Sequence, residues 1–430
     1  MDQVKYWQEI PGGVAAPQGF WASGVKAGIK YSDKYDVAVI LSEVEAQAAG
    51  VFTRNVIKAH PLLLTQKHLA NGTARAIVAN SGNANACVGA TGDQAALAMA
   101  RTTAEALGLN VDDVLVASTG VIGVEMPLEP VKKGIEQAAA EVRQLQRAIL
   151  AGSGELAGDF REGIAAEAQR LEAAHRAALA IMTTDMTVKE VSWELQCREG
   201  AVRLGAMAKG SGMIHPNMGT MLAFMTTDAQ ISASELQRLL REAVNDSFNM
   251  VTVDGDTSTN DMALFLANGA SGITPVGEDW ERFEYMVKAM AVYLAREIAR
   301  DGEGAGKLLE VKVTGAKTKE DARKIARSIC GSNLVKAAMF GEDANWGRIL
   351  CAAGYSGANF NPAKVNIYLG SLPVALAGQG VTFSEEAAKT ILQKEEIFIR
   401  LDLNNGLEEA TAWGCDLTYE YVRINGDYRT

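Results

Sequence analysis

The sequence predicts an α/β protein in which helices and buried strands pack in layers. Short apolar, β-branched runs at 37–41 and 76–79 have the composition of buried strands. They alternate with longer alanine-rich segments in which apolar residues recur at helical spacing. The chain has 42 glycines and only 9 prolines, a balance typical of tight turns between regular elements and few extended linkers. Together these observations favour a layered α/β fold.

The predicted helices are long enough to cover a sheet. Ser232 and Ser234 precede one of them as candidate N-cap residues, and Pro130 can occupy the first helical position of another. The six predicted helices span residues 93–107, 130–150, 164–181, 234–245, 280–300 and 319–330.

The sequence Met-Thr-Thr-Asp occurs twice, at 182–185 and at 225–228. Each copy ends an apolar run, so each predicts a core strand that leaves the sheet into a turn or a helix cap. Two strands with the same structural requirements can share this short sequence without an internal duplication.

The charge balance favours small-molecule partners. The 430 residues include 41 Lys and Arg against 52 Asp and Glu, a formal net charge of −11, and no dense basic run. Such a chain lacks the positive surface that sequence-independent binding of nucleic acid or of an anionic membrane requires. Neither nucleic acid nor a membrane is therefore expected as a partner.

Cysteine usage and the first residues of the sequence favour a reducing compartment. The five cysteines are widely spaced, with no C-x-x-C pair, and predict neither a disulfide framework nor a structural zinc site. The sequence starts without an apolar signal region and contains no run of 18 apolar residues. Secretion and membrane insertion are not expected, and the predicted location is the cytoplasm.

No cofactor motif is present in the sequence. The H-E-x-x-H, G-x-S-x-G and G-x-x-x-x-G-K-[ST] patterns are all missing. The segment 302–308 imitates a phosphate loop, but its spacing is too short and Leu308 stands where a hydroxyl would be needed. We therefore predict no metal, flavin or nucleotide cofactor.

The most unusual segment is a glycine-rich loop at 209–220 that leads into a strand-like apolar run. It ends in Thr220, whose hydroxyl can attack the carbonyl of Gly219 in an N-to-O acyl shift. Hydrolysis of the resulting ester frees an α-amine with a reference pKa of about 7.7–8.0, which can serve as the base for the threonine's own hydroxyl. The alternative is an ordinary loop before a strand that begins with threonine.

Five long motifs follow one another in the chain. They are 80–86 (Asn-Ser-Gly-Asn-Ala-Asn-Ala), 117–123 (Ala-Ser-Thr-Gly-Val-Ile-Gly), the loop and strand at 209–228, 254–261 (Asp-Gly-Asp-Thr-Ser-Thr-Asn-Asp) and 424–430 (Ile-Asn-Gly-Asp-Tyr-Arg-Thr). With these motifs the sequence resembles the ornithine acetyltransferase family of arginine biosynthesis over nearly its whole length.

The resemblance implies a precursor that cleaves itself between Gly219 and Thr220. Residues 1–219 and 220–430 would form α and β chains of one intertwined catalytic unit, assembled as two α/β pairs. Thr220 would carry an acetyl group from N-acetyl-L-ornithine to L-glutamate in a ping-pong cycle. Some members also accept acetyl-CoA, and the residues leave open whether this chain does. The implied fold is an αββα sandwich that resembles N-terminal-nucleophile hydrolases but is connected differently.

The resemblance also assigns site residues one by one. Thr119 and Gly120 match the family's oxyanion donors, a hydroxyl and a backbone amide. Lys209 matches a substrate-binding lysine that can pair with a carboxylate, and Glu303 matches a glutamate that contacts the substrate. Without the resemblance these residues would be read as a turn, a solvated loop lysine and a surface acid.

Three further positions match substrate contacts, namely Thr183, Asn425 and the C-terminal Thr430. Because neighbouring residues of a strand face opposite sides, only one of Thr183 and Thr184 is expected to face the substrate. Gly219 departs from the alanine usual in the family, and its greater conformational freedom predicts slower self-cleavage. For the polar residues of the 254–261 motif (Asp256, Ser258, Thr259, Asn260 and Asp261) we expect either a structural role or support of the residues that contact the substrate. For His215 we expect loop hydrogen bonding.

Two other functions compete with the transferase. A related self-processing amidohydrolase or aminopeptidase would pass the acyl group to water. An uncleaved amino-acid-binding protein would bind acetylornithine without acylation or turnover. Lys209, Glu303 and the tail at 425–430 favour the transferase, because they match amino-acid-binding positions.

Overall fold

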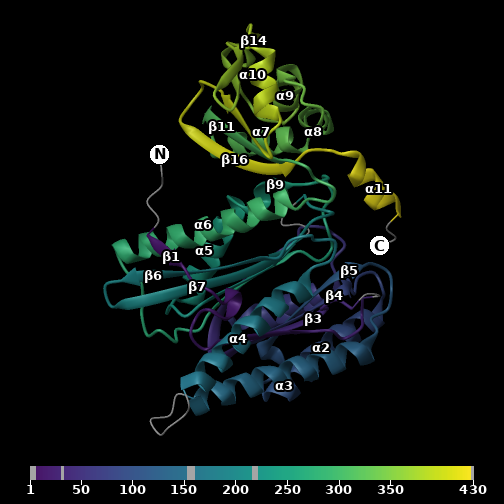
Figure 1. Ribbon diagram of the computed structural model, residues 1–430, viewed down its shortest axis with the longest axis vertical. Coiled ribbons are helices and arrows are strands. Elements are labelled where there is room, and N and C mark those ends of the chain that lie inside the picture. Colours follow the sequence, from purple (N-terminus) through teal and green to yellow (C-terminus); the bar gives the residue numbers. More distant parts are fainter. Residues whose placement is uncertain (1–5, 31–32, 153–159, 216–220, 428–430) are drawn as a thin grey trace.

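The computed structural model describes residues 6–30, 33–152, 160–215 and 221–427. A larger body is built on a nine-stranded sheet, and a smaller body above it carries a seven-stranded sheet (Figure 1). The strands of the first sheet are β1 (Trp7–Glu9), β2 (Phe20–Val25), β3 (Val37–Phe52), β4 (Thr73–Asn83), β5 (Val114–Val121), β6 (Lys189–Cys197), β7 (Gly200–Lys209), β8 (Leu222–Thr227) and β10 (Met262–Ala267).

The helices of the larger body cover this sheet on both sides. They are α1 (His60–His68), α2 (Ala90–Leu107), α3 (Leu128–Gly152), α4 (Phe160–Ile181), α5 (Ala233–Asn245) and α6 (Glu278–Arg300). In Figure 1, α2 and α3 lie below β3 and β4, whereas α5 and α6 lie above β6 and β7. With α7 (Lys319–Gly331), all six predicted helices are confirmed to within four residues at each end.

The long strand β3 divides the sheet into two halves. Its first residues pair with β2 on one edge and β4 on the other, and its last residues, 47–52, pair with β10. The ladder with β4 is irregular between Leu41 and Ala46. The sheet therefore folds back on itself, with β2, β4 and β5 in one half and β6, β7, β8 and β10 in the other.

Alternate residues of each strand face different cores. In β8, Phe224 joins an inner core that also holds Ile40 and Ile77 from the opposite half of the sheet, whereas Met225 faces the core beneath α5 and α6. In β4, Val78 points outward to the core beneath α2 and α3. The period of two along a strand thus produces helix, sheet, sheet and helix layers. The predicted αββα sandwich is confirmed.

The smaller body is a second α/β layer. Its strands are β9 (Val251–Thr252), β11 (Leu308–Ala316), β12 (Asn366–Leu369), β13 (Leu372–Leu376), β14 (Gln379–Gly380), β15 (Glu396–Asp402) and β16 (Glu408–Cys415), and its helices are α7 (Lys319–Gly331), α8 (Asn333–Phe340), α9 (Trp346–Gly354) and α10 (Glu385–Leu392). The last helix, α11 (Tyr419–Asp427), returns beside the larger body (Figure 1). Sequence periodicity did not separate this smaller body.

One predicted strand is wrong. The second copy of Met-Thr-Thr-Asp lies in β8 and the turn after it, as expected, but the first copy follows helix α4, which extends to Ile181. Residues 182–185 form a bend instead of a strand. The alanine-rich periodicity before Ile181 favours helix, and it overrides the strand-like composition of the last apolar residues.

Candidate active site

Six of the nine predicted site residues line one small pocket. It has a volume of about 140 Å³ and lies where segments far apart in the sequence meet. The predicted residues that line it are Thr119, Gly120, Thr183, Lys209, Glu303 and Asn425, and its other lining residues are Ile122, Thr184, Gly212, Met213, Ser258 and Asn260. Gly219, Thr220 and Thr430 lie outside the described residues.

The oxyanion candidates lie at the end of β5, where it runs beside β4. Gly120 has φ = +130°, and a Cβ there would come within 2.4 Å of the Gly82 carbonyl carbon. Only glycine fits this close approach. The neighbouring Ser118 is buried, and its hydroxyl donates to Asn80 Oδ1 at 2.6 Å. The backbone that carries Thr119 and Gly120 is thereby held in place.

Lys209 ends β7 with its side chain buried against the pocket. Burial lowers the pKa of its ammonium group, and the carboxylates of Asp185, Asp261 and Glu303 oppose this effect. A buried cation with access to a small pocket can pair with a substrate carboxylate.

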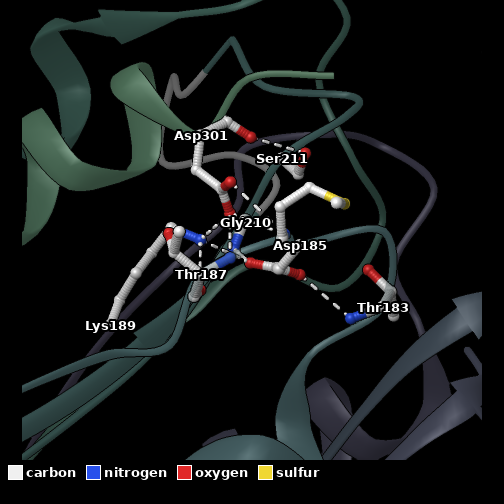
Figure 2. A network of polar contacts seen from close by, with 8 residues as sticks. Thr183, Asp185, Thr187, Lys189, Gly210, Ser211 and Asp301 are labelled. Atoms are coloured by element: carbon white, nitrogen blue, oxygen red, sulfur yellow. Dashed lines mark hydrogen bonds and ion pairs between the residues drawn. The ribbon is translucent and has the colours of Figure 1, made fainter. Parts of the chain in front are cut away.

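A buried ionic network joins Asp185, Lys189 and Asp301 (Figure 2). The Asp185 carboxylate accepts hydrogen bonds from Lys189 Nζ at 2.8 Å, from the Gly210 amide at 2.7 Å and from the Thr183 amide at 2.9 Å. Burial alone raises the pKa of Asp185, but the Lys209 and Lys189 ammonium groups and these hydrogen bonds hold that pKa well below its usual range. One carboxylate therefore positions the backbone of Thr183 and the backbone next to Lys209.

The network continues to the loop after α6. Lys189 Nζ also donates to Asp301 Oδ2 at 2.5 Å, and both Lys189 and Asp301 are almost completely buried. The Asp301 carbonyl accepts from Ser211 Oγ at 2.7 Å, and the Glu303 amide donates to the Ser211 carbonyl at 3.2 Å. These contacts join the Glu303 loop to the glycine-rich segment that follows Lys209.

Glu303 approaches this segment closely. A Cβ at Gly212 would lie 2.2 Å from the Glu303 carboxyl carbon, so glycine is needed there. Asn425 in α11 donates from Nδ2 to Glu303 Oε2 at 2.9 Å. The C-terminal motif and the Glu303 loop thus meet at the pocket, as the resemblance implied.

The predicted choice between Thr183 and Thr184 was based on strand alternation. Both residues line the pocket, because they lie in the bend after α4 and not in a strand. The argument from alternating strand faces is wrong for this segment.

The polar motif at 254–261 holds the neighbouring loop, and two of its residues line the pocket. Asp254 accepts from the amides of Met213 at 2.6 Å and Ile214 at 2.9 Å, which holds the loop before the predicted cleavage site. Asn260 lines the pocket and donates to the Ser118 carbonyl at 2.8 Å. Ser258 also lines the pocket, and no signal in the single sequence distinguishes these two residues from their neighbours.

Asp261 is the most unusual carboxyl group near the site. It is buried, and burial raises its pKa well above the usual range, although the Met221 amide and Lys209 act in the opposite direction. Its Oδ2 has no hydrogen-bond partner among the described residues. The Met221 carbonyl in turn accepts from the Met262 amide at 3.1 Å, so the residue after Thr220 is tied to β10.

His215 makes the loop hydrogen bonds that were predicted for it. Its Nδ1 lies 2.9 Å from Thr252 Oγ1, and its Nε2 lies 2.9 Å from Arg327 Nη2. Burial, and to a smaller extent Arg327, lower the pKa of His215 to about 4. The imidazole is therefore neutral near pH 7.

The described residues contain neither a candidate membrane span nor a cluster of metal ligands. Within that part of the chain, no helix is both long and apolar enough to cross a membrane. In the same residues, no three His, Cys, Asp or Glu side chains gather closely enough to hold a metal ion.

The comparisons with known proteins identify the family. The model of the ArgJ family matches residues 21–430. The chain belongs to the ArgJ family. The arginine biosynthesis bifunctional protein ArgJ of Symbiobacterium thermophilum is 52% identical over 426 residues, which cover 98% of this chain and 99% of that protein. Arginine biosynthesis bifunctional protein ArgJ 1 of Clostridium acetobutylicum is 49% identical over 418 residues, with 96% of each chain covered.

One solved structure is also similar to this chain. It is the ornithine acetyltransferase of Mycobacterium tuberculosis, complexed with ornithine, which is 36% identical, with 48% of this chain and 95% of that chain covered and a TM-score of 0.38. ArgJ membership confirms the predicted family, and the similar relatives are named as proteins of arginine biosynthesis, the pathway that was predicted.

Proposed function

We propose that this chain moves an acetyl group from N-acetyl-L-ornithine to L-glutamate through an ester on Thr220. The observation that carries the proposal is the single pocket, which gathers Thr119, Gly120, Lys209 and Glu303 from three distant parts of the chain. These residues match the parts of an acetylated amino acid. The Thr119 hydroxyl and the Gly120 amide can donate to the oxygen of the acetyl group. Lys209 can pair with a carboxylate, and Glu303 can pair with an ammonium group.

In the first half-reaction the Thr220 hydroxyl oxygen attacks the acetyl carbonyl carbon. Its proton passes by way of the α-amine to the leaving nitrogen, and the C–N bond breaks to release ornithine. Thr119 and Gly120 donate hydrogen bonds to the oxyanion of the tetrahedral intermediate. In the second half-reaction the amine of glutamate attacks the ester, N-acetylglutamate leaves, and the hydroxyl regains its proton.

The substrate's charged ends match the charged walls of the pocket. Lys209 can pair with the α-carboxylate, and Glu303, held by Asn425, can pair with the side-chain ammonium of ornithine. Whether acetyl-CoA serves as a second donor is left open by these residues.

Self-cleavage between Gly219 and Thr220 is part of the proposal. The two pieces would stay together, because β7 and β8 pair along Leu204–Lys209 and Leu222–Thr227, and this ladder does not depend on the bond that breaks. An assembly of two such pairs and a cytoplasmic location remain expectations taken from the family and the sequence.

The decisive experiment measures ornithine release from N-acetylornithine with and without glutamate. The transferase should release ornithine in step with the appearance of N-acetylglutamate, and release without glutamate should stop after one acetyl group per enzyme. Sustained hydrolysis in the absence of glutamate would instead identify the amidohydrolase. Binding of acetylornithine without any release would identify the amino-acid-binding protein.

Thr119→Ala should lower kcat by about 10²- to 10³-fold, the usual cost of removing one oxyanion donor. The fold should remain, because Thr119 is only partly buried at a strand end. Steady-state kinetics together with the melting temperature test this expectation. Thr184→Ala serves as the matched control, since it removes a threonine hydroxyl from the same pocket that is assigned no part in oxyanion binding. An unchanged kcat in Thr119→Ala would remove this residue from the oxyanion site.

A further inference from the structure

A second cavity, much larger than the active-site pocket, lies between α7 and the loops of the larger body. Its volume is about 760 Å³, against about 140 Å³ for the pocket of the proposed transferase. Its charged lining residues are Arg54, Glu320, Arg323, Lys324 and Arg327, and its other lining residues include His215, Asn245, Asn249, Thr257, Ser328, Tyr355 and Ser356.

The cavity has an excess of positive charge in a protein whose net charge is −11. The nearby carboxylates are already engaged. Asp246 is shared by Arg323 and by Lys319, whose Nζ lies 2.8 Å from it, and Glu320 lies 3.9 Å from Lys324. No ion pair to Arg54 or to Arg327 is found among the described residues.

Among these cations, the contacts of Arg327 give the clearest indication of a binding site for an anion. Its Nη2 lies 2.9 Å from His215 Nε2. Because a guanidinium group only donates hydrogen bonds, His215 Nε2 must be the acceptor. His215 Nδ1 then carries the proton and donates to Thr252 Oγ1 at 2.9 Å. The imidazole is neutral in this arrangement and forms no ion pair with Arg327, on which the Glu320 carboxylate acts only at longer range. The Arg327 Nε is also buried without a hydrogen-bond partner among the described residues.

We propose that this cavity binds a phosphate-bearing anion. Arg323 and Arg327 lie one helical turn apart on α7, and Arg54 approaches from the segment after β3. Guanidinium groups on separate walls suit an anion with several charged oxygens. A single carboxylate needs only one guanidinium group, which can donate two parallel hydrogen bonds to it. The cavity volume leaves room for a phosphate ester or a diphosphate. This site is distinct from the proposed acetyl-transfer pocket and does not rest on that function.

The two cavities share a wall. Thr257 lines the larger cavity and donates from Oγ1 to the His215 carbonyl at 2.9 Å, and the next residue, Ser258, lines the active-site pocket. A bound anion would therefore contact the same loop that precedes the predicted cleavage site.

The test is calorimetric titration of the full-length protein with pyrophosphate, inorganic phosphate and adenosine diphosphate. Pyrophosphate should bind with an affinity that falls as sodium chloride is raised. Arg54→Gln and Arg327→Gln should each weaken binding by about tenfold or more, as expected for loss of a charge-assisted contact. Tighter binding of adenosine diphosphate than of pyrophosphate would identify a nucleotide as the source of the phosphate group.

Arg101→Gln is the matched control, because it removes an exposed arginine from α2, outside the cavity. It should change the affinity by less than twofold. If Arg327→Gln fails to fold after losing its contact with His215, the exposed Arg54 still carries the test. The proposal is overturned if none of the three anions binds at millimolar concentration, or if Arg54→Gln binds pyrophosphate as tightly as the unaltered chain.

Discussion

Thr220→Ala is expected to abolish both self-cleavage and acetyl transfer. Without a hydroxyl there is no nucleophile for the acyl shift at Gly219, and without cleavage there is no free α-amine to act as base. The same substitution also removes the acetyl acceptor. Removal of this one hydroxyl should therefore stop two reactions that are separate in time.

Denaturing intact-mass analysis measures both reactions in one sample. Cleavage after Gly219 divides the 430 residues into pieces of 219 and 211 residues, and incubation with N-acetylornithine should add about 42 Da to the second piece, the mass of one acetyl group on the threonine nucleophile. Thr220→Ala should give one intact chain with no added mass. Acetyl transfer at the normal rate in this variant would overturn the mechanism.

Two neighbouring substitutions separate the hydroxyl from the shape of the loop. Thr220→Ser keeps a hydroxyl and should retain part of both reactions. Gly219→Ala restores the residue usual in the family and should speed cleavage, because alanine restricts the backbone more than glycine does. If Gly219→Ala also prevented cleavage, the loop conformation would control maturation. The loss of cleavage in Thr220→Ala would then not by itself show that the hydroxyl is the nucleophile.

The layers of the fold were predictable because their physical signals are local. Apolar residues at helical spacing located α2 to α7, and β-branched runs located the start of β3 and the centre of β4. The wrong prediction of a strand at 182–185 has a local cause as well. Apolar residues at the end of a buried helix and in a buried strand have the same composition. The smaller body was missed because no change of composition marks its boundary.

The pocket was predicted only through the motifs of the family. Position along the chain gives no sign that Thr119, Lys209, Glu303 and Asn425 meet in space. Lys189 and Asp301 were missed altogether, because a lysine in a strand and an aspartate after a helix are usually solvated residues. Their burial becomes apparent only when the folded chain brings two lysines and two carboxylates together behind the site.

Asp185→Asn should weaken substrate binding and shift the pH dependence of catalysis. The carboxylate of Asp185 raises the pKa of the buried Lys209 ammonium group, so its loss should let that pKa fall further. Lys209 must be charged to pair with a substrate carboxylate. The alkaline limb of kcat/KM should therefore move to lower pH, and KM for N-acetylornithine should rise by about tenfold.

The same substitution should also destabilise the protein, by about 3–5 kcal/mol, the usual cost of leaving a buried charge without its partner. Because the folded-state pKa of Asp185 is lowered, its contribution to stability is present above its unfolded pKa and is lost as the pH falls through the folded-state value. Asp185→Asn should accordingly lack this part of the acid destabilisation. Denaturant unfolding at neutral and acid pH measures the difference.

Two controls distinguish electrostatic positioning of Lys209 from a purely structural role. Asp228→Asn alters another buried carboxylate, which accepts from the amides of Gln18 and Arg203, and should cost stability without moving the alkaline limb. Asp185→Asn combined with Lys189→Met restores the charge balance of the buried network. Because the Lys189 ammonium group lowers the pKa of Lys209, its removal should move the alkaline limb part of the way back toward its normal position. If the limb stayed in its normal position in both the single and the double variant, the network would hold the fold without tuning Lys209.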